Sequence, residues 1–422
     1  MKNVILKQLQ KFKARVGETP SLNLDIELKS VNLLTLLKGQ TNDQAIYPTI
    51  FWQDKEKQQS IACFGKIDEV SSVPVVTDEA CYFGGLAFQQ EGPQWDGFPA
   101  KRFIRPVLAF KIENELLTLT CHFDGKQRID DTIAMVKKLQ SPIALCEQGV
   151  EIKQRTDKPT KTHWAELVDL AIENKALLPK VVLSRETTLQ CNHKANQWDM
   201  LHRWHLANKN SFLFSFQFAK GSAFIGCSPE RLFSRENNKL ETEALAGTVN
   251  RGRNDREDDI LLQSLLSDRK IDRENHLVQE FIIANLKKLK AEVVCDTPRV
   301  MQLHNVQHLC VPISATLCDE TSDDQILDYL HPTPAVGGTP KEPALQFIHE
   351  NEPYLRGWYA GAVGYICKEK SDFSVAIRSA LIADKQIKLF AGAGIVTGSI
   401  AEQEWQELDN KISTVLNVIT NK

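Results

Sequence analysis

The chain has 422 residues, and its 51 Lys and Arg against 54 Asp and Glu give a formal net charge of -3. Positive and negative residues are mixed along the sequence, so no basic face indicates a nucleic-acid partner, and no stretch approaches the roughly 18 consecutive apolar residues of a membrane span. The length exceeds what one hydrophobic core usually supports, which leaves two domains or one large layered domain. The mixed charge makes a small molecule the expected partner. No obligatory protein partner is expected.

Residues 1–16 are basic and loosely amphipathic. A surface helix is the favoured interpretation, with an organelle transit peptide as the alternative. No compact apolar segment resembles a secretory signal, so the cytoplasm is the simplest location. The ten cysteines are scattered without a CxxC pair, and Cys310 and Cys367 lie in apolar runs where a reduced thiol packs as a small hydrophobe. They favour a reducing compartment and no structural zinc site.

A polar run at residues 153–161, KQRTDKPTK, is the best candidate for a linker. It separates a less informative N-terminal part, residues 1–155, from a motif-rich part, residues 156–422. After it, apolar residues recur at helical spacing over residues 164–171, and Pro179 then precedes the apolar, β-branched run at residues 181–183. Lys180 therefore stands at the start of a predicted strand.

The rest of the chain predicts a sheet covered by helices. Alternating Phe residues at 212–218, a turn at Lys220-Gly221 and a strand at residues 223–227 predict an antiparallel hairpin. We expect further strands at residues 239–244, 306–315, 360–367, 374–381 and 387–391, and helices at residues 260–290 and 400–419. The predicted fold class is α+β.

Glu274 is the first candidate ligand for a cation. Leu277, Val278, Phe281 and Ile282 follow it at helical spacing, so on a helix Glu274 shares their buried face. A buried carboxylate is costly unless a cation or hydrogen bonds compensate for its lost hydration. Either a bound cation or a salt bridge to Lys or Arg would satisfy Glu274, and spacing alone favours the salt bridge.

Glu404, Glu407 and Lys411 fall on one stripe of the predicted C-terminal helix. Solvated ion pairing is the commoner explanation of such a triplet. Residues 391–399 just before it read AGAGIVTGS, and their glycines permit close backbone approach beside a helix N-terminus, which suits an anion. The segment lacks the Lys-Ser/Thr ending of a P-loop, so a small carboxylate fits better than a nucleotide.

Ten sequence blocks follow one another in the order typical of a single family. They are LPKVVLSR (178–185), FIGCSPERL (224–232), TEALAGT (242–248), DRENHLV (272–278), VQHL (306–309), HPTPAVGGTP (331–340), GWYAGAVGY (357–365), AIRSAL (376–381), AGAGIV (391–396) and EQEWQELDNK (402–411). In these blocks the chain resembles the chorismate-utilising enzymes, which include isochorismate, salicylate, anthranilate and aminodeoxychorismate synthases. The N-terminal part resembles the family only loosely, through pieces such as YFGGLAF (82–88).

The resemblance implies an α+β fold like that of anthranilate synthase component I, with residues 1–422 as a single unit. Two antiparallel-sheet halves would be enclosed by helices, and the predicted linker would be internal.

The resemblance also implies a magnesium site and a chorismate pocket. Glu274 and Glu407 match the family's Mg²⁺ ligands, with Glu404 acting directly or through water. Arg378 and Tyr359 match ligands of the second substrate carboxylate, although an Arg within a predicted strand is also compatible with a structural ion pair. The pocket would be completed by His308, Thr248, Gly247, Gly394 and Lys411. His308 alone would more often be a hydrogen-bonded core histidine.

Lys180 and Glu230 match the family's catalytic pair on opposite faces of the ring. Forming isochorismate requires a base for the attacking water and an acid for the departing hydroxide, and the resemblance assigns these roles to Lys180 and Glu230. Lys180 must then have a lowered pKa, through desolvation or a neighbouring cation, and Glu230 a raised one. Without the resemblance, a surface Lys and a turn Glu would be the simpler interpretation.

Differences within the family favour an isochorismate synthase of menaquinone biosynthesis. Ala246 stands where covalent aminodeoxychorismate synthases carry Lys, and amine-transferring members tend to lack a Lys at position 180. TEALAGT and EQEWQELDNK look most like the menaquinone-pathway enzymes. The alternatives are a salicylate synthase, which goes on to eliminate pyruvate, a siderophore-pathway isochorismate synthase, and a non-catalytic chorismate-binding protein.

Overall fold

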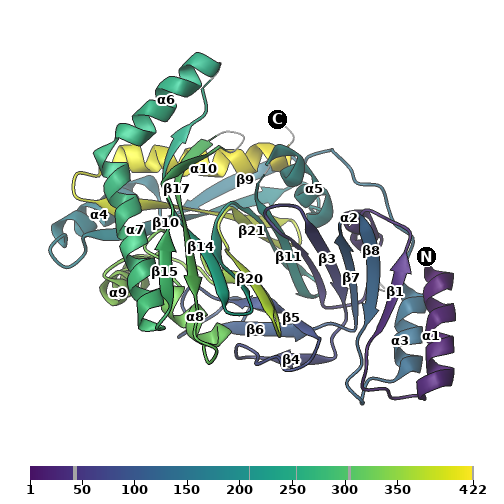
Figure 1. Cartoon of the computed structure of the whole chain (residues 1–422). Coiled ribbons are helices and arrows are strands. Elements are labelled where there is room, and N and C mark those ends of the chain that lie inside the picture. The colour runs from purple at the N-terminus through teal and green to yellow at the C-terminus, as the bar shows by residue number, and fades with distance from the viewer. Residues whose placement is uncertain (41–44, 209, 253, 303–305, 421–422) are drawn as a thin grey trace.

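Two large antiparallel sheets with helices around them make up the computed structural model (Figure 1). The structure describes residues 1–40, 45–208, 210–252, 254–302 and 306–420. The strand pairs in these residues are antiparallel, and the helices lie before, between and after the strands along the chain. The predicted α+β class, with two antiparallel-sheet halves enclosed by helices, is confirmed.

The larger sheet combines strands from the N-terminal part with strands from the motif-rich part. In spatial order these are β1 (Leu24–Leu28), β8 (Leu116–Cys121), β7 (Leu108–Glu113), β3 (Gln59–Phe64), β2 (Thr49–Gln53), β11 (Phe212–Ala219), β12 (Ser222–Ser228), β21 (Ser379–Ala383), β22 (Gln386–Val396), β10 (Lys180–Cys191) and β18 (Gly338–Thr339), with β9 (Ile152–Lys158) also paired to β10. The two parts meet where β2 pairs with β11, which places Trp52 opposite Phe214.

The second sheet is mixed in the same way. Its strands are, in spatial order, β15 (Glu292–Cys295), β17 (Val306–Thr316), β14 (Lys239–Asn250), β13 (Arg231–Glu236), β20 (Lys370–Val375), β19 (Ala362–Cys367), β5 (Cys81–Leu86), β6 (Lys101–Arg105) and β4 (Asp68–Val70), with β16 (Arg299–Gln302) paired to β17. Here the two parts of the chain join where β5 pairs with β19.

The helices cover the sheets with amphipathic faces. They are α1 (Lys2–Val16), α2 (Leu33–Gly39), α3 (Ile129–Lys138), α4 (Lys161–Glu173), α5 (Gln197–Ala207), α6 (Asp255–Ser267), α7 (Arg269–Lys288), α8 (Asp323–Leu330), α9 (Lys341–Asn351) and α10 (Ala401–Thr420). Two of them matter for the site: α7 packs on β14 with Val278 and Ile282 buried, and α10 packs on β22 with Leu408 and Ile412 buried. In Figure 1 they lie on the side of the molecule away from α1 and α3.

Two of the places where the chain passes from one sheet to the other are held side by side. One crossing, between β12 and β13, contains Pro229 and Glu230, and the other, between β20 and β21, contains residues 376–378. Hydrogen bonds tie them together: the Val375 N–H donates to the Glu230 carbonyl at 3.1 Å, and the Cys227 N–H donates to the Arg378 carbonyl at 3.0 Å. The two crossings are therefore held in fixed positions relative to one another.

The second crossing corrects one sequence prediction. A single strand was expected at residues 374–381, with Arg378 in its middle. Instead β20 ends at Val375, and Arg378 lies in the bend before β21 with φ of +48°. A strand cannot belong to two sheets without a bend, and alternation of apolar residues does not reveal where a chain changes sheet.

Three further predictions differ from the structure. The linker expected at residues 153–161 is mostly β9, whose polar sequence suits an exposed edge strand. Residues 391–399 were expected to form an anion-binding segment, but residues 391–396 belong to β22 and pair with β10. The helix expected at residues 260–290 is divided into α6 and α7 at Asp268.

The N-terminus and the cysteines give one confirmed and one wrong prediction. Residues 2–16 form α1, which buries Ile5, Leu9 and Phe12, as expected of a surface helix. Cys367, expected as a reduced thiol, forms a disulfide with Cys81 directly opposite on the paired strands β5 and β19. Because the two cysteines are 286 residues apart in the chain, local spacing gives no sign that they pair. Among the described residues, no helix is long and apolar enough to cross a membrane.

Candidate active site

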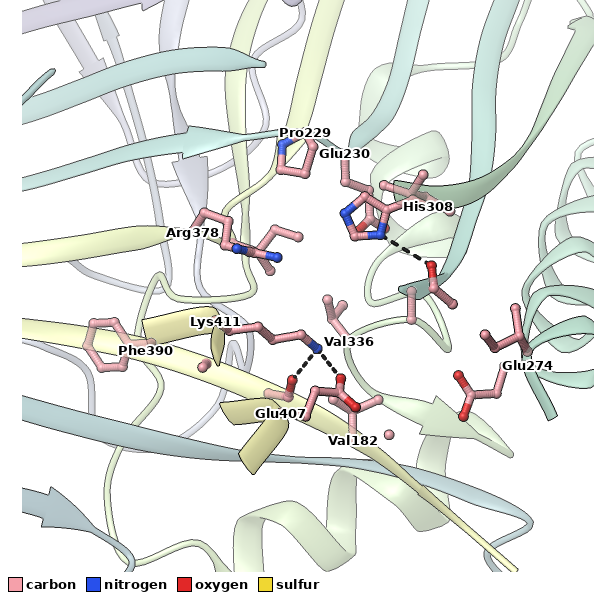
Figure 2. A pocket seen from close by; sticks show the side chains of 18 of the residues that line it. Val182, Pro229, Glu230, Glu274, His308, Val336, Arg378, Phe390, Glu407 and Lys411 are labelled. Atoms are coloured by element: carbon pink, nitrogen blue, oxygen red, sulfur yellow. Dashed lines mark hydrogen bonds and ion pairs between the residues drawn. The ribbon is translucent and has the colours of Figure 1, made fainter. Parts of the chain in front are cut away.

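A cavity of about 270 Å³ lies where the two sheet crossings meet β10, β22, α7 and α10 (Figure 2). Part of its wall is apolar and consists of Val182, Leu245, Ile271, Val336, Ile377 and Phe390. The polar side chains come from distant parts of the chain and converge on the same space. A small, partly apolar cavity with a few converging polar groups is typical of a binding site for a small molecule.

Lys180 is the first residue of β10, and its side chain lines the cavity while remaining only 2% exposed. The residue is fixed between two strands, because it pairs with Val396 of β22 and with Thr339 of β18. Burial lowers the pKa of the Lys180 ammonium, and Lys411 lowers it further, whereas Glu274 and Glu230 act in the opposite direction. The uncharged amine is therefore more accessible than on a solvated lysine.

Glu230 shows the opposite behaviour in the first crossing. It lines the same cavity and is 4% exposed. Burial, reinforced by the negative charge of Glu243, raises the pKa of Glu230 to about 8, although Lys55 and Lys180 act to lower it. At neutral pH the carboxyl group consequently keeps its proton and is able to donate it.

Two further carboxylates reach the cavity from helices. Glu274 points into it from α7, and Glu407 from α10 (Figure 2). The Lys411 ammonium donates to the Glu407 carboxylate at 2.5 Å and to the Gly392 carbonyl at 2.9 Å. The ion pair of Glu407 with Lys411, which the helical spacing suggested, is thus present, and it forms part of the cavity wall.

Two glycines let side chains approach the backbone closely. A Cβ atom at position 394 would lie 3.3 Å from Lys180 Cε and 3.8 Å from Glu274 Oε1. Gly247 has φ of +81°, and a Cβ there would lie 2.2 Å from Ile271 Cγ2. Glycine at position 394 therefore lets the Lys180 side chain pack tightly against the backbone beside the Glu274 carboxylate. Glycine at position 247 lets Ile271 of α7 pack closely against β14.

Arg378 and Tyr359 lie in the part of the cavity nearer the second crossing. The Arg378 guanidinium donates to the Thr414 hydroxyl at 3.1 Å. Burial lowers the pKa of Arg378, and the neighbouring Tyr359, Cys227 and Glu407 partly restore it. The Tyr359 ring stacks on Phe390, with ring centres 5.0 Å apart. These groups offer one guanidinium and one phenol to a carboxylate ligand.

His308 is held in its neutral form. Its Nδ1 atom lies 3.3 Å from the Gly247 carbonyl, a separation that suits an N–H donor at this nitrogen. Burial, followed by the charge of Arg378, lowers the pKa of His308 to about 3. The ring therefore contributes hydrogen bonding to the cavity without contributing a charge.

The structure brings most of the predicted site residues together. Ten of them line this one cavity: Lys180, Glu230, Gly247, Glu274, His308, Tyr359, Arg378, Gly394, Glu407 and Lys411. Glu404 is buried one turn before Glu407 on α10 and is not among the lining residues that the structure describes. Thr248 pairs with His308 in the sheet, and its side chain lies outside the described part of the structure.

Sequence reasoning missed the apolar wall and two charged residues behind Glu230. Val182, Val336 and Phe390 were assigned to strands or connections without a role, because apolar residues carry no chemical signature. Lys55 and Glu243 were not considered at all. Glu243 lies within the TEALAGT block, so its position was a usable signal, whereas Lys55 lies in an undistinguished polar turn of the N-terminal part.

The donor set fits a magnesium ion whose coordination is completed by a ligand. The described residues contain no cluster of three or more metal-ligating side chains. Mg²⁺, however, is commonly held by one or two carboxylates together with substrate oxygens and water. Glu274 and Glu407 supply two carboxylates to one cavity, and Gly394, which also lines it, lies close to the first of them.

Comparison with known proteins extends the likeness over the whole chain. A family model described as "Chorismate binding enzyme" matches residues 7–420. The isochorismate synthase MenF of Escherichia coli is 43% identical over 421 residues, which cover 96% of this chain and 95% of that protein. The match includes the N-terminal part, where the sequence blocks gave only a loose resemblance.

Solved structures give the same result. The menaquinone-specific isochorismate synthase MenF from Escherichia coli superposes with a TM-score of 0.88, at 31% sequence identity over the superposition, and covers 99% of this chain and 100% of that one. Anthranilate synthase component I from Streptococcus pneumoniae superposes with a TM-score of 0.72 over 85% of this chain and 92% of its own. Its 20% identity supports a likeness of fold alone.

Proposed function

Because the chain belongs to the family of chorismate-binding enzymes, we propose that it is an isochorismate synthase, an isomerase that interconverts chorismate and isochorismate. Relatives of this name match along almost the whole chain, and the superposable menaquinone-specific enzyme supports a role in menaquinone biosynthesis. One observation carries the proposal above all: Lys180 and Glu230 line the same buried cavity, with pKa values displaced in opposite directions.

Lys180 would act as the base. In its uncharged form the amine accepts a proton from water, whose oxygen then forms a bond to a ring carbon of chorismate while the ring double bonds shift. Burial favours this uncharged form because the ammonium has lost most of its hydration. The Glu274 carboxylate would stabilise the ammonium that results, and Glu230 would add to this once it has donated its proton.

Glu230 would act as the acid. The hydroxyl group on another ring carbon leaves with its bonding electrons and takes the proton of Glu230, so that it departs as water. Burial and Glu243 keep this proton in place at neutral pH until it is needed. One water enters and one leaves, and the two side chains return to their starting protonation states by exchange with solvent.

The substrate carboxylates would be held at two sides of the cavity. Arg378 and Tyr359 suit one of them, with Lys411, His308, Thr248 and the backbone at Gly247 and Gly394 around the ring. Glu274 and Glu407 would hold Mg²⁺, with Glu404 acting directly or through water. The chemistry that bound Mg²⁺ supplies is a positive charge beside the other substrate carboxylate, which favours binding and stabilises displaced ring electrons.

Product analysis tests the proposed function. Purified protein incubated with chorismate and Mg²⁺ is expected to yield isochorismate, identified by chromatography and mass spectrometry, without release of pyruvate. Pyruvate formed together with salicylate would instead identify a salicylate synthase. Calorimetric binding of chorismate without any product would identify a non-catalytic chorismate-binding protein.

The two proposed metal ligands can be tested through the magnesium dependence of activity. We expect Glu274→Gln and Glu407→Gln to raise the Mg²⁺ concentration for half-maximal activity by about tenfold or more, since even a group that only supports a metal ligand typically contributes that much to affinity. Glu402→Gln, an exposed change on the first turn of α10, is the matched control. An unchanged Mg²⁺ dependence in either variant would remove that residue from the ligand set.

We also propose that the enzyme works in the cytoplasm with chorismate as its partner and without an obligatory protein partner. The small-molecule character of the cavity supports chorismate as the partner.

A further inference from the structure

The turn between β2 and β3 brings the N-terminal part against the crossing that carries Glu230. Lys55 lies in this turn and is buried, and its ammonium lies 2.5 Å from the carboxylate of Glu243 on β14, which is also buried. A buried ion pair of this kind costs desolvation energy, so other groups must hold its members in place. Neither residue lines the cavity, and above they enter only through the effect of their charges on the pKa of Glu230.

Glu243 also fixes the backbone directly after Glu230. The Arg231 N–H donates to Glu243 Oε1 at 2.9 Å. The Arg231 guanidinium is held in turn by Glu56, with distances of 2.7 and 3.0 Å, and by Asp372 at 3.3 Å. Two consecutive residues of the β2–β3 turn thus hold the two residues joined by this backbone hydrogen bond: Lys55 pairs with Glu243, and Glu56 pairs with Arg231.

Charged side chains on several elements affect the pKa of Glu230. Glu243 raises its pKa, whereas Lys55 from the β2–β3 turn and Lys180 from β10 lower it. His308 from β17 and Arg378 from the second crossing also line the cavity that Glu230 faces. Because Lys55 and Glu243 are paired and act in opposite directions, loss of one member leaves the other uncompensated.

Building on the acid role proposed for Glu230, we propose that Lys55 and Glu243 form a positioning pair, in which Glu243 anchors the backbone after the acid and Lys55 offsets the charge of Glu243. The N-terminal part then contributes to the chemistry by way of Glu230, although its sequence carries few family blocks. The pair acts through Glu230 and does not itself touch the substrate.

The test is the titration of Glu230 in protein labelled with ¹³C at the glutamate carboxyl carbons. The Glu230 and Glu243 resonances are assigned by their loss in Glu230→Gln and Glu243→Gln. Lys55→Met removes the positive charge that offsets Glu243, while Glu243 keeps its hydrogen bond from the Arg231 N–H, so the Glu230 midpoint is expected to rise by about one pH unit. Glu243→Gln leaves Lys55 uncompensated, and the midpoint is expected to fall by a similar amount.

Two further variants separate this role from a merely structural one. Lys55→Arg keeps the charge and is expected to leave the midpoint and kcat near their wild-type values. The double variant Lys55→Met/Glu243→Gln removes both charges without burying a lone one, and its midpoint is expected to lie between those of the single variants. Shifts in the same direction, or shifts below about 0.3 units in both single variants, would overturn the inference. Because the titration needs no turnover, it fails independently of the product analysis.

Discussion

Replacing Lys180 with Ala is expected to lower kcat by about 10²–10⁴-fold, the usual contribution of a positioned acid or base. The variant loses the amine that accepts the proton of the attacking water. It keeps the two carboxylates proposed to hold Mg²⁺ and the Arg378 and Tyr359 side chains proposed to hold the substrate. Chorismate binding, measured by calorimetry in the presence of Mg²⁺, should therefore remain close to that of the wild type.

The matched control is Lys175→Ala, an exposed lysine five residues earlier. It removes an ammonium of the same chain segment and should leave kcat unchanged. If Lys180→Ala retained substantial isochorismate production, Lys180 would not be the base.

The second large effect is expected for Glu230→Gln. The amide has nearly the size of the carboxylic acid and is also uncharged, but it cannot deliver a proton to the departing hydroxyl group. We expect kcat to fall by about 10²–10⁴-fold, again with chorismate binding preserved. Glu236→Gln, an exposed change at the end of β13, is the control.

The pKa of Glu230 predicts how the acid role depends on pH. Its pKa is raised to about 8, chiefly by burial. The proton that the acid must donate is therefore present at neutral pH and is lost as the pH rises through about 8. A wild-type Glu230 resonance that titrates near the ordinary glutamate value would contradict the acid role, as would a Glu230→Gln variant with full activity.

The residue pattern alone predicted the α+β class and two parts of the site. Helical spacing placed Glu274 on an inward face, and it placed Glu407 beside Lys411, because a helix repeats regularly over short distances. Pro179 and the run that follows placed Lys180 at the start of a strand. The roles of Glu230, Arg378 and His308 came from the family resemblance, because each side chain reaches the cavity through long-range pairing.

The errors have specific physical causes. Glycine is equally suited to a loop and to a strand approached by large side chains, so residues 391–396 were assigned to the wrong class of structure. Arg378 was placed within a strand because alternation continues across the point where the chain changes sheet. The pairings of Cys81 with Cys367 and of Lys55 with Glu243 join residues far apart in the chain, and local spacing contains no information about them.

Isotope incorporation tests the addition of water most directly. Chorismate is incubated with the enzyme and Mg²⁺ in ¹⁸O-labelled water, and the isochorismate formed at early times is examined by mass spectrometry. Water activated by Lys180 should leave one ¹⁸O atom in each product molecule, with the original hydroxyl oxygen released to solvent. Isochorismate that forms at the normal rate without ¹⁸O would mean that the hydroxyl group migrates within the substrate, and that no water is activated.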